Sequence, residues 1–154
     1  MTVSIRASPY HDAAPDMQAA RLVVGCYALT VASWSDPSAN GGHIPYPPRI
    51  ELDTERRDLG QRAFQLVART PGFPTERSSR FPPGWSPVGA DSLQVLAWND
   101  GFSSVTLFVR RQPDGTLSGT ARYFTDALVV DSTGRWMWER YPTTPVTLRR
   151  TPCT

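Results

Sequence analysis

Apolar and polar residues alternate along most of the chain after residue 21, most clearly over residues 105–110 and 146–149. A period of two is typical of a β-strand that buries one face and exposes the other. The apolar runs are also rich in β-branched and aromatic residues, which favour strands. We therefore predict eight strands, over residues 22–34, 49–54, 62–70, 92–98, 102–111, 116–130, 135–141 and 146–151.

Turn signals separate several of these segments. Asn99-Asp100-Gly101 and Pro113-Asp114-Gly115 both place Gly after Asp, as tight hairpin turns require. Strands linked by hairpins close most simply into a barrel, because closure removes exposed edges. The predicted fold class is all-β, an eight-stranded antiparallel up-and-down barrel, with a two-sheet β-sandwich as the alternative.

The same patterns divide the chain. Residues 1–20 are rich in Ala, broken by Pro and without periodicity, so we predict a flexible N-terminal tail with a short helix over residues 15–20. Residues 21–154 are predicted to form a single barrel domain. Residues 71–89 are rich in Pro and are predicted to be a long loop whose Trp85 packs down on the barrel or caps its mouth.

Strand parity predicts which residues share the barrel interior. The apolar face carries the predicted ligand-binding set: Phe64, Leu66, Val95, Ala97, Leu107, Ala121 and Tyr123, with Trp136 and Trp138 closing one end. Parity places Trp98 on the opposite face of its strand, so either Trp98 lies under the 71–89 loop or the register of this strand differs from the expected one. An eight-stranded barrel holds either its own side chains or one small ligand. Small residues at the centre favour a ligand, whereas a core filled by large aromatic residues is the alternative.

Composition narrows the classes of function. The 154 residues carry a net charge of +2, and all 16 basic residues are Arg, scattered along the chain. This scatter argues against nucleic-acid binding, which requires a clustered basic surface. No apolar run is long enough for a transmembrane helix. The two histidines, His11 and His43, form no metal-ligand spacing, and no nucleophile motif occurs. No catalytic residue, metal or cofactor is predicted.

Two cysteines lie near the two ends of the predicted barrel. Cys26 lies in the first strand and Cys153 follows the last one, and these strands are neighbours in a closed barrel. We therefore predict a Cys26–Cys153 disulfide, with two buried thiols as the alternative. A disulfide is typical of an oxidising compartment, so an extracytoplasmic location is expected. Residues 1–20 lack the apolar core of a signal peptide, which leaves a missing leader, another start site or a cytoplasmic location open.

Three short motifs resemble the lipocalin, or calycin, superfamily. Gly25-Cys26-Tyr27 corresponds to the Gly-x-Trp of the family's first strand, and Thr125-Asp126-Ala127 to its late Thr-Asp-Tyr turn. Arg149 or Arg150 corresponds to the Arg that packs over the Trp in that family. The resemblance implies a lipocalin-like barrel of bacterial type that holds a small apolar ligand.

Three functions remain open at this point. The first is a carrier or sensor of a small apolar molecule, without catalysis. The second is a barrel enzyme of cyclase or isomerase type, which requires polar side chains pointing inward. The third is a cell-envelope interaction module with a filled core. The oligomeric state is not predicted.

Overall fold

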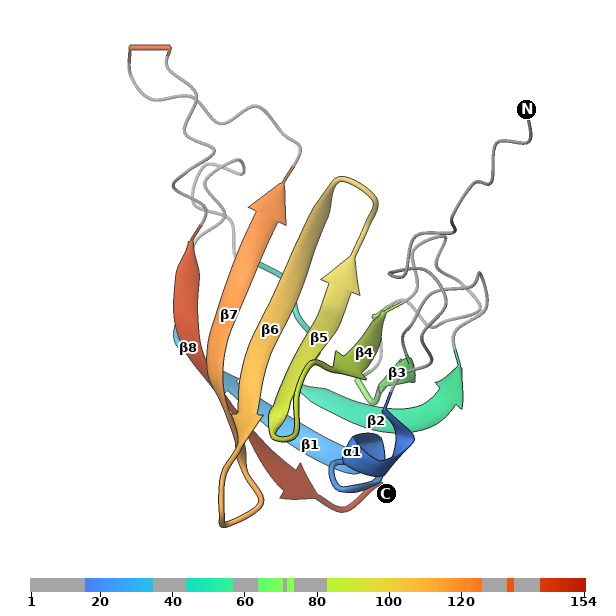
Figure 1. Ribbon diagram of the computed structural model, residues 1–154. Coiled ribbons are helices and arrows are strands. Elements are labelled where there is room, and N and C mark those ends of the chain that lie inside the picture. The colour runs from blue at the N-terminus through green and yellow to red at the C-terminus, as the bar shows by residue number, and fades with distance from the viewer. Residues whose placement is uncertain are drawn as a thin grey trace, which may run out of the picture.

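The computed structural model describes residues 16–34, 44–56, 64–70, 72–73, 83–125, 133–134 and 142–154. These residues form one short helix and eight strands (Figure 1). The elements are α1 (Met17–Arg21), β1 (Gly25–Val31), β2 (Arg49–Arg56), β3 (Phe64–Ala68), β4 (Gly84–Pro87), β5 (Ser92–Asn99), β6 (Ser103–Arg111), β7 (Leu117–Thr125) and β8 (Thr143–Thr151).

The strands form a closed barrel in the order β1-β2-β3-β4-β5-β6-β7-β8, and every neighbouring pair is antiparallel. Closure occurs between β1 and β8, which pair from Cys26↔Thr151 to Val31↔Val146. This confirms the predicted up-and-down barrel, and the β-sandwich alternative is wrong because the first and last strands are hydrogen-bonded.

The predicted long loop over residues 71–89 is wrong in part, because it contains β4. Trp85 is not a loop cap: it pairs with Val95 of β5 and is only 1% exposed. The sequence did not predict this short strand, because Gly84 and Pro87 are residue types that are depleted in strands. Pairing on both sides, with β3 and β5, holds it in the barrel nonetheless. The predicted strand over residues 135–141 lies outside the described residues.

The other predicted strands agree with the structure to within a few residues. β7 ends at Thr125, where the longer predicted segment was expected to bend, and residues 126–130 lie outside the described residues. The helix expected near residue 20 is α1, whose N-cap Asp16 accepts hydrogen bonds from the backbone N–H groups of Gln18 and Ala19. No helix in the described part of the chain is long and apolar enough to cross a membrane.

α1 packs against one end of the barrel, which we call the α1 end (Figure 1). Its Ala20 is fully buried, and Val23 in the following turn is 3% exposed. The β5–β6 hairpin lies at the opposite end, which we call the far end. β1 runs from the α1 end to the far end, and each following strand runs opposite to the one before it. The last residues of β7 and the first residues of β8 therefore lie at the far end.

The predicted disulfide is present and joins Cys26 on β1 to Cys153 beyond β8, across a sequence separation of 127 residues. It ties together the two strands that close the barrel, and the described residues contain no free cysteine.

Replacing both cysteines with Ala should lower the free energy of unfolding. In the chain-entropy model a loop of this length gives an effect of about 4–5 kcal/mol, and measured values are often smaller. Urea denaturation of the oxidised wild type and the double variant measures the difference. An unchanged midpoint would contradict a stabilising role for the bridge.

Gly119 on β7 permits a close approach by β6. A Cβ added there would lie 2.0 Å from the carbonyl oxygen of Phe108, which is backbone and has no flexible side chain to yield. Gly119→Ala should therefore destabilise the barrel by about 1–3 kcal/mol, the usual cost of overpacking. Gly89→Ala is the matched control, because its Cβ would meet nothing closer than 3.9 Å. Equal unfolding midpoints for the two variants would refute this.

Candidate functional site

The barrel interior contains every described member of the predicted ligand-binding set. Their exposed fractions are 0% for Phe64, Leu66, Val95, Leu107 and Ala121, 1% for Tyr123 and 3% for Ala97. These seven residues belong to one hydrophobic cluster. Trp136 and Trp138 lie outside the described residues. The structure therefore places these seven side chains together, while their role in binding stays a prediction.

Large aromatic side chains occupy much of this interior. Trp85 packs against Phe64, with ring centroids 5.1 Å apart, and Tyr27 is fully buried. The indole N–H of Trp85 donates to the carbonyl of Asp53 at 2.9 Å, beside a register shift of β2 between Leu52 and Arg56. A bulge leaves backbone groups without partners on the neighbouring strand. The indole N–H therefore satisfies the Asp53 carbonyl in place of a hydrogen bond from β3.

Trp98 faces the interior, which corrects the outward position expected from parity. β5 shifts register between Leu96 and Trp98, so that Leu96 pairs with Thr106 but Trp98 pairs with Val105. Val105 is 1% exposed and inward-facing, and directly paired residues share a face. A bulge inserts one extra residue and so reverses the parity beyond it. Ala97 and Trp98 consequently both lie on the core side.

This shift creates a row of inward side chains near the far end. Trp98 pairs with Val105, and Val105 pairs with Tyr123. We call these three residues the far-end row. Trp98 is half-buried and packs against the hydrophobic cluster. The sequence left the position of Trp98 open between an outward face and an altered register, because a strand with regular alternation gives no sign of a single inserted residue.

Hydroxyl groups lie beside the far-end row. The Tyr123 hydroxyl donates to Ser103 Oγ at 3.2 Å, and Ser103 Oγ donates to Thr125 Oγ1 at 2.9 Å. Thr125 and Thr144 are the buried polar residues in the described part of the chain. Inward polar groups were not expected from the apolar parity set, so the far end is more polar than predicted.

A small cavity opens next to Trp98. Its volume is about 10 Å³, and it is lined by Ala68, Phe73, Pro83, Ala97, Trp98 and Asn99. A water molecule requires roughly 10–15 Å³ measured in this way. The described residues thus leave room there for about one water.

The α1 end is closed by Arg150 and Tyr27. The guanidinium of Arg150 lies 5.3 Å from the Tyr27 ring centroid and donates to the carbonyls of Val24 and Leu22, both at 3.0 Å. Of the two predicted arginines, Arg150 is therefore the one that covers Tyr27. Gly25 adopts a φ of +136°, which favours glycine, and a Cβ there would lie 3.0 Å from the Arg150 guanidinium. The absence of a side chain at Gly25 therefore leaves room for the Arg150 guanidinium over the Tyr27 ring.

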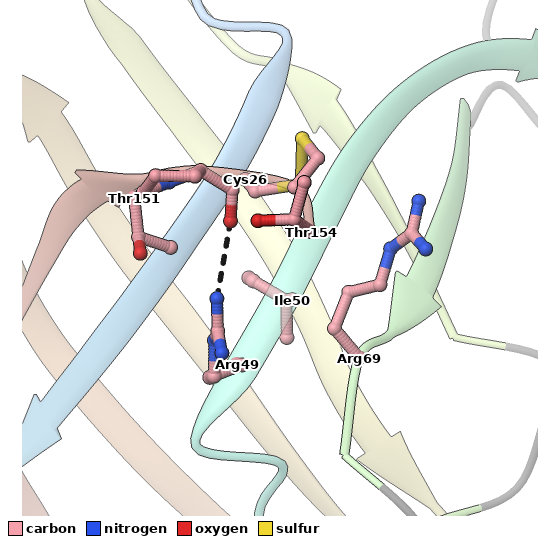
Figure 2. Close-up of a pocket in the computed structure, with 8 residues that line it drawn as sticks. Cys26, Arg49, Ile50, Arg69, Thr151 and Thr154 are labelled. Atoms are coloured by element: carbon pink, nitrogen blue, oxygen red, sulfur yellow. Dashed lines mark hydrogen bonds between the residues drawn. A yellow bond between two sulfur atoms is a disulfide. The ribbon is translucent and has the colours of Figure 1, made fainter.

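A larger groove lies on the outer wall, near the disulfide (Figure 2). Its volume is about 160 Å³, and it is lined by Cys26, Arg49, Ile50, Arg69, Thr151, Pro152, Cys153 and Thr154. Arg49 donates to the carbonyl of Pro152 at 3.1 Å, and Arg69 forms an ion pair with Glu51. Sequence reasoning missed this groove, because only the register of β1, β2 and β3 brings these distant arginines together.

One group of described residues has metal-ligand geometry. The side-chain ligand atoms of Cys26, Glu51 and Cys153 lie within 4.8 Å of one another. Both sulfurs are joined in the disulfide, however, and metal binding requires thiolates. The oxidised protein therefore does not offer this group as a metal site.

Comparison of the chain with protein-family models, curated proteins and solved structures finds no match.

The buried Tyr27 hydroxyl links stability to pH. It donates to the Val23 carbonyl at 2.7 Å, and burial raises the Tyr27 pKa above its ordinary 10.0, an effect that Arg150 partly opposes. Since ionisation is disfavoured in the folded state, this contribution is present below pH 10 and is lost as the pH rises through the folded pKa.

Tyr27→Phe should cost about 1 kcal/mol near neutral pH, the net contribution of one hydrogen bond. Its deficit relative to wild type should then shrink as the pH rises above 10. Urea denaturation of both proteins across this range measures the deficit. A deficit that stays constant or grows would disprove the linkage.

Proposed function

We propose that the protein is a lipocalin-like binding protein, without catalysis, for a small apolar molecule. The ligand is held at the far end of the barrel, against the far-end row and the adjacent Ala97. The closed eight-stranded barrel is compatible with this function, since barrels of this size hold either side chains or one small ligand.

The observation that carries this proposal is the register shift in β5. It turns Trp98 toward the core and leaves the small Ala97 beside it, in a barrel whose α1 end is closed by Arg150. A half-buried aromatic ring next to small side chains is typical of an apolar binding site. Among the described residues, Trp85, Phe64 and Tyr27 occupy the deeper interior, which leaves the far end as the route by which a ligand would enter.

The hydroxyls near the far-end row support binding better than catalysis. Tyr123, Ser103 and Thr125 are hydroxyl-bearing side chains joined by two hydrogen bonds, and neutral donors and acceptors of this kind orient a bound ligand. They suit a ligand that carries one polar group at an otherwise apolar body. The disulfide supports an oxidising, extracytoplasmic location.

A cell-envelope interaction module with a filled core is the second candidate function. The small volume beside Trp98, about 10 Å³, favours it. The two functions differ in whether the far end accepts additional volume.

Ala97→Trp distinguishes them. If the far end receives a ligand, the added indole occupies that space, abolishes ligand uptake and costs little stability. If the core is filled, the same change overpacks it and costs roughly 1–3 kcal/mol or more. Thr120→Trp is the control, because Thr120 is exposed on the outer face of β7.

The measurements are native mass spectrometry of protein purified from its own host and thermal denaturation of the three proteins. Retention of a small molecule by wild type and Thr120→Trp, but not by Ala97→Trp, supports the proposal. A large drop in melting temperature for Ala97→Trp alone, with no retained molecule in wild type, contradicts the binding proposal and supports the filled core.

A further inference from the structure

Three arginines lie in one row across the outer wall of the barrel. Ala28 of β1 pairs with Arg49 of β2 on one side and with Arg149 of β8 on the other. The backbone N–H of Arg69 donates to the carbonyl of Arg49, so Arg69 stands opposite Arg49. All three arginines are exposed, whereas the neighbouring Ile50 is fully buried in the core. The row therefore reads Arg69, Arg49, Ala28, Arg149.

Like charges directly opposite on neighbouring strands repel each other and weaken a sheet. Arg69 is relieved by its ion pair with Glu51. Arg149 has the Asp114 carboxyl nearby, whose pKa lies below its usual range mainly because Thr116 donates to it and, to a smaller extent, because of the Arg149 charge. Arg49, in the middle, has no carboxylate partner among the described residues, and its hydrogen bond goes to the neutral carbonyl of Pro152.

The groove described above lies at this uncompensated charge. Arg49 and Arg69 stand on either side of Ile50 below the C-terminal segment, and Thr151 and Thr154 line the opposite side (Figure 2). The volume of about 160 Å³ is more than ten times the roughly 10–15 Å³ that one water requires. Guanidinium groups present five donors each, and one donor of Arg49 is engaged with Pro152.

We propose that this groove is a binding site for a small oxyanion, a phosphate or carboxylate group, held by Arg49 and Arg69. An oxyanion placed there accepts charge-assisted hydrogen bonds from both guanidinium groups and removes the repulsion between them. The hydroxyls of Thr151 and Thr154 are further donors on the same groove. The site lies on the outer face of the β1–β2 wall and does not depend on ligand binding in the interior.

Glu51 gives this proposal a specific signature. Its carboxylate neutralises Arg69 and repels an incoming anion. Glu51→Gln should therefore tighten anion binding, because it frees Arg69 and removes a negative charge. A cation site at the same place would respond in the opposite direction, since Glu51 is its one carboxylate.

The test uses the full, oxidised chain titrated with inorganic phosphate and, separately, with acetate, at constant ionic strength balanced by chloride. Isothermal titration calorimetry gives the affinity, and the Nε–Hε signals of arginine in NMR spectra locate the site. Arg49→Gln should weaken binding at least about tenfold, as expected for the loss of one hydrogen bond between charged groups. Arg122→Gln, on the outer face of β7, should leave the affinity unchanged.

Binding of phosphate or acetate that weakens in Arg49→Gln and strengthens in Glu51→Gln supports the site. Whichever of the two anions binds more tightly to the wild type shows whether the groove prefers a phosphate or a carboxylate group. Three results overturn it: no binding beyond that of chloride, equal affinity in wild type and Arg49→Gln, or weaker binding in Glu51→Gln. Circular dichroism of each variant confirms that the barrel is folded.

Discussion

The closing pair of strands, β1 with β8, is the constraint on which the rest of the structure depends. Six paired positions join the two chain ends, and the disulfide and Arg150 secure that seam from opposite faces of the wall. The disulfide lies on the outer face, while the Arg150 guanidinium covers Tyr27 at the α1 end. Because an open barrel would expose two strand edges and the apolar side chains behind them, closure at the seam is needed for the aromatic interior to be buried.

Alternation of apolar and polar residues was sufficient to predict seven of the eight strands, the closed barrel and the disulfide. A period of two specifies which face of a strand is buried, and seven predicted interior residues are indeed buried. The failures have a single origin. Trp98 and β4 depend on pairing with other strands: one bulge reverses the face of Trp98, and β4 is held between β3 and β5 despite its Gly and Pro. Such pairing is tertiary and leaves no local pattern.

The arginine row shows the same limit on the outer wall. Arg49, Arg69 and Arg149 are far apart in sequence and appear scattered, and this scatter argued against a clustered basic surface. Register places all three on one line across adjacent strands. The same register that buries Ile50 determines this line, because the residues on either side of an inward residue must point outward. Core packing and surface charge are therefore set by one alignment of strands.

The far-end row and the groove on the outer wall depend on different parts of the strand register. The far-end row depends on the bulge in β5, and the groove depends on the seam and on the disulfide that holds residues 152–154 against β1. A strand that slipped by one residue would turn Arg49 inward and bury its charge, at a cost that no described carboxylate offsets. The charge of Arg49 is thus tolerable only at the surface, where water solvates it or a bound oxyanion neutralises it, and this restricts the registers that β2 can adopt against β1.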